Sequence, residues 1–301
     1  MKIDLITGLL GAGKTSFLKY YAAYLLSQGE KIGIIENDFG AVNIDMMLLQ
    51  ELQDRCEIEM IAGGDRASYL RRFKTKLIAM KMRGLDRIIV EPSGLFDVDE
   101  FFDLLHDEPL NQWYELNSII ALIDGQALSS LDTDLKEIFI SQLLPAGQII
   151  VTRKEKNDRE VICDKINSWL LPYHYQLSAK ELLCLDVHDL TDLQLQQLSQ
   201  CGYQLRGIMR RQHPVFDQYE TLYIMDKSYP LSDMIQRIKE MMDNQNCGKI
   251  RRIKGFVNDG GWIEINATPQ QIHTNTVTKG QKVLIIIGEK LNKEKIMTYF
   301  Q

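Results

Sequence analysis

The chain has 301 residues, of which 45% are hydrophobic and 25% are charged, and its formal net charge is -6. This length allows two domains, and the composition is typical of a soluble globular protein. The acidic balance argues against a dedicated nucleic-acid binder, which needs a basic surface. No apolar run approaches roughly 18 residues, the length of a membrane span, so we expect no membrane partner.

The first residues enter a predicted strand at once, which indicates that no secretory signal is present. The five cysteines are Cys56, Cys163, Cys184, Cys201 and Cys247. Their number is odd, and no two are close enough to form a C-x-x-C pair. We therefore predict reduced, structural thiols and a cytoplasmic location.

In the first half of the chain, apolar runs alternate with helical patterns. Strands are predicted over residues 2–8, 31–38, 56–64, 86–94, 117–125 and 147–155, and helices over 14–28, 45–55 and 66–83. This alternation predicts an α/β domain with a mostly parallel sheet. Each of the last three strands ends in polar residues, and in open α/β folds ligands bind at that carboxyl edge.

The pattern changes after about residue 205. A strand and then a helix are predicted within residues 219–242, and a last helix over 292–300. Between them lie predicted strands over residues 248–257, 261–268, 270–277 and 281–289. We predict an α/β domain over residues 1–205, a small α+β domain over 206–301, and a linker over 206–218.

Residues 8–15 read G-L-L-G-A-G-K-T and match the pattern G-x-x-x-x-G-K-[ST] without a gap. In such a loop, backbone N–H groups and the positive end of the following helix bind phosphates. Lys14 is expected to reach the β- and γ-phosphates, and the Thr15 hydroxyl to ligate Mg²⁺. The predicted phosphate-binding residues are Gly8, Leu9, Leu10, Gly11, Ala12, Gly13, Lys14, Thr15 and Ser16. The domain over residues 1–205 is therefore predicted to be a P-loop nucleotide-binding domain.

Two further motifs follow in order, I-I-E-N-D-F-G-A-V-N-I-D over residues 34–45 and V-E-P-S-G over 90–94. With the phosphate loop, they make the chain resemble the CobW-type P-loop GTPases, which are relatives of the urease and hydrogenase nickel-insertion GTPases. The C-terminal residues are similar to the small C-terminal domain of that family. The resemblance implies a switch that binds GTP or GDP with Mg²⁺ and helps to deliver a metal or cofactor to a client protein. It also implies pairing of two copies as a homodimer.

The resemblance gives three residues a catalytic role, namely Lys14, Asp38 and Glu91. Glu91 would hold Mg²⁺ or its water, the alternative being a carboxylate that only caps a neighbouring backbone. Asp38 would lie in the loop that senses the γ-phosphate, although the family usually has the longer Glu there. The implied reaction is in-line attack of water on the γ-phosphate, with slow turnover until a partner completes the site.

The metal motif of the family, a C-x-C-C that follows a glycine, is missing. Gly63 matches the preceding glycine, and Gly64, Arg66 and Ala67 stand where the thiolates would be. A soft site for zinc or copper needs thiolate or imidazole ligands, and an arginine repels cations. The five histidines are scattered along the chain. We therefore predict that the switch is kept and the three-thiolate metal site is lost.

The base-reading motif also departs from the family. GTPases of this class use N-K-x-D, in which Asn braces the phosphate loop, Lys packs on the purine and Asp accepts from guanine. Aligned without gaps, Thr152, Arg153 and Glu155 take those three roles. A shifted alignment uses residues 155–158 instead. Both alignments keep a carboxylate suited to guanine, so guanine is predicted.

Two other functions stay open on this sequence. One is a nucleotide-gated binding module without significant hydrolysis or metal carriage, and the other is an ATP-using P-loop enzyme. The basic helix over residues 66–83 is interpreted as a solvated face, with contact to an acidic client as the alternative. The aromatic residues over 99–116 are interpreted as core, with a partner groove as the alternative.

Overall fold

A computed structural model describes residues 1–38, 52, 54–62, 66–153, 159–173, 175–204, 219–225, 227–278, 280 and 282–300. These residues form two compact units, one of residues 1–37 and 52–204 and the other of residues 219–300. The boundary predicted after residue 205 and the linker predicted over 206–218 lie outside the described residues and stay predictions. Within the described part of the chain, no helix is both long enough and apolar enough to cross a bilayer.

The first unit is built on a seven-stranded sheet with the strand order β3-β2-β4-β1-β5-β6-β7. The strands are β1 (Lys2–Thr7), β2 (Ile32–Asp38), β3 (Glu57–Ala62), β4 (Arg87–Glu91), β5 (Glu115–Asp124), β6 (Gln148–Thr152) and β7 (Leu182–Cys184). All the strands from β2 to β7 in this order run parallel. Because β1 lies between β4 and β5, the chain changes direction across the sheet beside β1, where α/β folds bind ligands.

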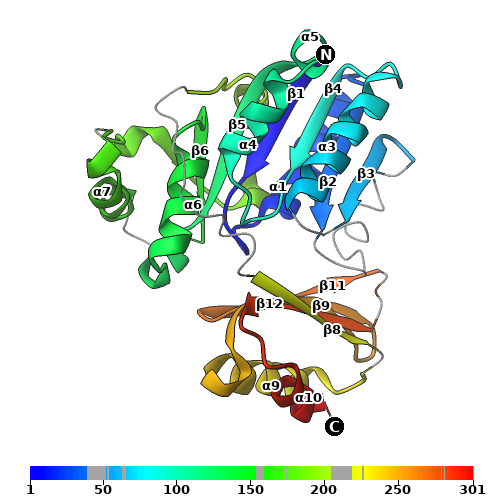
Figure 1. Cartoon of the computed structure of the whole chain (residues 1–301), viewed down its shortest axis with the longest axis vertical. Coiled ribbons are helices and arrows are strands. Elements are labelled where there is room, and N and C mark those ends of the chain that lie inside the picture. The colour runs from blue at the N-terminus through cyan, green and yellow to red at the C-terminus, as the bar shows by residue number, and fades with distance from the viewer. Residues whose placement is uncertain are drawn as a thin grey trace. The chain divides into compact units, whose positions relative to one another are not determined.

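Helices cover both faces of this sheet. They are α1 (Lys14–Ser27), α3 (Arg66–Lys81), α4 (Val98–His106), α5 (Leu110–Trp113), α6 (Thr133–Leu143), α7 (Arg159–Leu170) and α8 (Asp192–Leu198). Helix α1 lies behind the sheet in Figure 1, and α3, α4 and α6 lie in front of it. The front layer buries an apolar core that includes Phe73, Phe101 and Phe139 against Ile3 and Leu5 of β1. The predicted α/β class with a mostly parallel sheet is confirmed.

A buried ion-pair network lies at the amino-terminal ends of β1 and β4. The Arg87 guanidinium is 2.7 Å from Asp4 Oδ2 and 2.7 Å from Glu30 Oε2. The side chain of Asp4 is 0% exposed and that of Arg87 is 2% exposed. Burial raises the pKa of Asp4 above its usual range, and the charge of Arg87 opposes that rise. The network therefore fixes the start of β4, the strand that ends at Glu91.

The second unit is a five-stranded antiparallel sheet with the order β11-β10-β9-β12-β8. Its elements are β8 (Tyr219–Met225), α9 (Leu231–Asp243), β9 (Lys249–Asn258), β10 (Trp262–Thr268), β11 (Gln271–Val277), β12 (Val283–Glu289) and α10 (Lys293–Met297). Both helices pack on one face of this sheet, where Met234, Ile238 and Ile296 are buried against Ile253 and Ile286. The α+β character predicted for this part of the chain is confirmed.

Several details differ from the sequence prediction. A helix is predicted over 45–55, but most of that range lies outside the described residues, and Asp54 and Arg55 form a turn. The last helix is predicted over 292–300, whereas α10 ends at Met297 and a single 3-10 turn, Thr298–Phe300, follows it. The short strand β7 is not predicted at all. Its three residues, Leu182–Cys184, are too few to show a periodic pattern, and they become a strand because they pair with β6.

Candidate functional site

The phosphate loop connects β1 to α1 and depends on glycine. Gly8 has a φ of 138°, a backbone conformation that residues with a Cβ rarely adopt. A Cβ added there would lie 2.3 Å from the carbonyl oxygen of Leu122 in β5. The strand pairing and the loop therefore both require glycine at the first position of the motif.

Lys14 and Thr15 begin helix α1, and both side chains are buried, with 6% and 9% exposed. Lys14 Nζ donates to the carbonyl oxygen of Gly8 at 3.0 Å, so the ammonium group folds back over the loop. The Thr15 hydroxyl donates to Glu91 Oε1 at 3.0 Å. These contacts bring a cation and a hydroxyl–carboxylate pair to the two ends of the same loop.

Glu91 is the last residue of β4 and lies beside a second buried carboxylate. Glu36 in β2 pairs in register with Glu91, so their side chains leave the sheet on the same side. Glu36 is 1% exposed and Glu91 is 6% exposed. The Thr15 hydroxyl and the Glu91 carboxylate are hard oxygen donors, the type that Mg²⁺ prefers. These two residues therefore fit the predicted Mg²⁺ site.

The sequence analysis did not single out Glu36. It took the γ-phosphate sensor to be Asp38, which ends β2 and whose side chain lies outside the described residues. The signal for Glu36 was present in the sequence, because an acidic residue ends the apolar run I-G-I-I before Asn37 and Asp38. A carboxylate after a buried strand is the same feature that marked Glu91.

The turn after β4 touches the phosphate loop directly. A Cβ on Gly94 would lie 2.4 Å from the backbone nitrogen of Leu10 and 2.7 Å from the carbonyl carbon of Leu9. The amide of Gln142 in α6 donates to the carbonyl oxygens of Gly94 and Phe96, both at 3.1 Å. Gln142 is therefore a positioning residue for this turn, and the sequence analysis missed it because it lies inside a helix.

At the end of β6, two predicted base-motif residues contact the phosphate loop. The Thr152 hydroxyl lies 3.1 Å from the carbonyl oxygen of Ala12. A guanidinium nitrogen of Arg153 donates to the carbonyl oxygen of Gly11 at 2.8 Å and to Asp124 Oδ2 at 3.1 Å. Thr152 thus has the bracing contact that its predicted role requires. Glu155 and the shifted alternative over 155–158 lie outside the described residues.

The residues that replace the metal motif are only partly described. Gly63, Gly64 and Asp65 lie outside the described residues, and Arg66 and Ala67 begin α3 with undescribed side chains. Among the described residues, no three His, Cys, Asp or Glu side chains form a group that could hold a metal ion. Loss of the thiolate site stays a prediction from the sequence.

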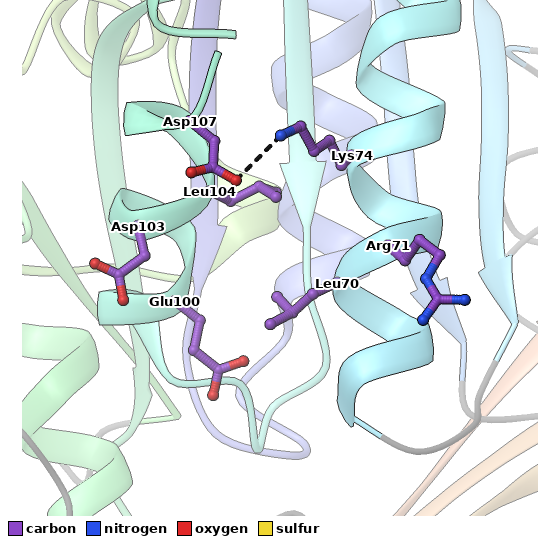
Figure 2. Close-up of a pocket in the computed structure, with 7 residues that line it drawn as sticks. All are labelled: Leu70, Arg71, Lys74, Glu100, Asp103, Leu104 and Asp107. Atoms are coloured by element: carbon purple, nitrogen blue, oxygen red, sulfur yellow. Dashed lines mark hydrogen bonds and ion pairs between the residues drawn. The ribbon is translucent and has the colours of Figure 1, made fainter. Parts of the chain in front are cut away.

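The basic helix α3 has acidic partners on its surface. Lys74 pairs with Asp107 at 3.0 Å, and Lys76 pairs with Glu59 at 2.5 Å. A pocket of about 320 Å³ lies between α3 and α4, and in Figure 2 Lys74 and Asp107 face each other across it while the Arg71 guanidinium points away. These contacts favour the interpretation of α3 as a solvated, ion-paired face.

Of the aromatic residues predicted as core, Phe101 and Tyr114 are buried, and Phe102 and Trp113 are half-buried against the core of the first unit. Phe101 is fully buried, and its ring stacks on that of Phe73 with centroids 6.2 Å apart. Tyr114 is 9% exposed, and its hydroxyl donates to the carbonyl oxygen of Leu77 at 2.8 Å. The core interpretation agrees with this packing.

Several known proteins are similar to this chain in sequence. Residues 2–176 match the family model described as CobW/HypB/UreG, nucleotide-binding domain. The zinc chaperone YjiA of Escherichia coli (strain K12) is 26% identical over 289 residues, covering 87% of this chain and 82% of YjiA. The zinc chaperone YeiR of the same strain is 28% identical over 161 residues, covering 53% of this chain and 48% of YeiR. The chain thus matches about half the length of YeiR.

Solved structures of this kind align over the whole chain. The crystal structure of Zn(II)-bound YjiA GTPase from E. coli covers 100% of this chain and 98% of its own, with 18% sequence identity and a TM-score of 0.38.

Proposed function

Because the chain belongs to the CobW/HypB/UreG family, we propose that it is a magnesium-dependent switch that binds and hydrolyses GTP. We further propose that the switch assists the delivery of a metal or cofactor to a client protein. The observation that supports it most directly is the 3.0 Å hydrogen bond between Thr15 and Glu91 behind the phosphate loop. A hydroxyl and a carboxylate held together at that place form the donor pair that Mg²⁺ needs beside a triphosphate.

In the proposed reaction, the loop amides and the start of α1 bind the β-phosphate. Lys14 exchanges its bond to the Gly8 carbonyl for the β- and γ-phosphate oxygens. Thr15 and Glu91 would hold Mg²⁺, which would neutralise charge on the phosphate oxygens. Water attacks the γ-phosphate in line with the departing GDP, and the buried carboxylate of Glu36, which pairs in register with Glu91, orients it. The matched motifs show no arginine finger, so turnover without a partner is expected to be slow.

The proposal is tested by comparing GTP hydrolysis by the parent, Lys14→Ala and Lys74→Ala. We expect Lys14→Ala to lose hydrolysis and Lys74→Ala, which breaks only an exposed ion pair, to keep the parent rate. Equal rates for the parent and Lys14→Ala would overturn the proposal.

A second candidate function has a specific observation in its favour. Gly64, Arg66 and Ala67 stand at the thiolate positions of the metal motif, which favours a nucleotide-gated binding module that does not carry a soft metal. Hydrolysis stimulated by a client protein would argue against this second function. Calorimetry with GDP and ADP on nucleotide-stripped protein separates these two proposed functions from that of an ATP-using enzyme. An ATP-using enzyme would bind ADP, and GDP would not compete.

A further inference from the structure

A chain of contacts links the end of β5 to the phosphate loop through Arg153. The Arg153 guanidinium is 2.8 Å from the Gly11 carbonyl oxygen and 3.1 Å from Asp124 Oδ2. The side chain of Asp124 is 5% exposed and that of Arg153 is 26% exposed. The ion pair is therefore partly shielded from water, where charge–charge attraction is stronger than on an open surface.

Asp124 is held rigidly at this place. It is the last residue of β5 and pairs in register with Thr152 of β6. Its Oδ1 accepts from the backbone nitrogen of Gln126 at 3.0 Å, which leaves Oδ2 to accept from Arg153. One carboxylate oxygen thus accepts a hydrogen bond from the turn that follows β5, and the other accepts one from the arginine.

The backbone of Arg153 needs this support. Its φ is 48°, in the left-handed region that residues with a Cβ rarely adopt. The guanidinium contacts with the Gly11 carbonyl oxygen and with Asp124 hold this residue in place.

We infer that Asp124 is a positioning residue that sets nucleotide preference by holding Arg153 between β5 and the phosphate loop. Arginine has a planar fork of donors, so it must be oriented before its stem can lie against a purine, whereas a lysine ammonium has no such requirement. Asp124 supplies that orientation without touching the nucleotide. The inference rests on the proposed function, because it names what tunes the base site of the same switch.

The test measures calorimetric affinities of the full, nucleotide-stripped chain for GDP and for inorganic tripolyphosphate, both with Mg²⁺. Tripolyphosphate reports the phosphate loop alone because it has no base. We expect Asp124→Asn and Arg153→Gln each to weaken GDP binding about tenfold and to change tripolyphosphate binding less than twofold. Asp107→Asn removes a carboxylate from an exposed ion pair and serves as the matched control, with unchanged affinities.

A double-mutant cycle decides whether Asp124 acts through Arg153. In the Arg153→Gln background, Asp124→Asn is expected to cost less than a further twofold. Independent, additive losses would overturn the inference, as would equal losses for GDP and tripolyphosphate. If Asp124→Asn does not fold, Arg153→Gln decides alone, and a GDP loss under twofold overturns the inference. A parent that binds tripolyphosphate but not GDP overturns the proposed guanine switch itself, which is a distinct result.

Discussion

The contact between Gly94 and the phosphate loop predicts a large functional effect from one methyl group. In Gly94→Ala, the new Cβ would approach the Leu10 nitrogen to 2.4 Å, about 1 Å short of an ordinary contact. The opposing atoms are backbone, so no side chain can rotate away and the loop itself must move. A displacement of about 1 Å at a reacting site can cost on the order of a hundredfold. We therefore expect GDP affinity and GTP hydrolysis to fall by roughly that factor.

The assay is calorimetric GDP binding by the parent, Gly94→Ala and Gly261→Ala, with thermal unfolding of each. Gly261 has open space around its Cβ position, so Gly261→Ala should bind GDP as the parent does. Overpacking alone costs about 1–3 kcal/mol of stability, and a Gly94→Ala chain that stays folded at the assay temperature keeps the test valid. GDP affinity within threefold of the parent would refute the reasoning.

Three further predictions follow from buried groups. Arg87→Leu leaves the Asp4 carboxylate buried without its ion-pair partner and should lower the free energy of unfolding, measured in urea at pH 7, by about 3–5 kcal/mol. Arg83→Leu breaks only exposed pairs and should lower it by under about 1 kcal/mol. Equal losses in the two variants would contradict this prediction. Because burial raises the pKa of Asp4, the protonated form is favoured in the fold, so the loss in Arg87→Leu should shrink as pH falls towards 4. Burial raises the pKa of the Cys201 thiol to about 11, so its alkylation in the native protein should be slow at pH 8 and rise about tenfold per pH unit up to pH 10, and a flat profile would count against it. Thr152→Val removes one hydrogen bond to the phosphate loop and should weaken GDP binding by about 0.5–1.5 kcal/mol, while an unchanged affinity would deny the bracing role.

Six of the seven strands of the first unit could be predicted because each is a short apolar run with a polar end, whereas β7 is too short to show a pattern. The order β3-β2-β4-β1-β5-β6-β7 could not, because it depends on which distant strands pair. The role of Arg87 could not be predicted for the same reason, because the sequence shows it only as a residue near the start of a predicted strand. Only the three-dimensional structure brings it to Asp4, 83 residues away in the chain.

The candidate site also contains some residues that could be predicted from the sequence and others that could not. The phosphate loop was predictable because its glycines, Lys14 and Thr15 are contiguous and have a known mechanism. Asp124 and Gln142 were not, since they act on backbone groups and on another side chain far away in the sequence. A carboxylate after a strand was taken as significant at Glu91 and overlooked at Glu36 and Asp124, although the local pattern is similar.

Side chains from outside and inside the phosphate loop hold its carbonyl oxygens before any ligand arrives. Lys14 and Thr152 each contact a different one, so these parts of the loop do not have to order themselves around an incoming phosphate. Binding then loses little entropy, and arrival of a nucleotide needs only that Lys14 exchange one partner for another. We expect association rates to be similar for different nucleotides, and the lifetime of the bound state, set by dissociation, to distinguish one nucleotide from another.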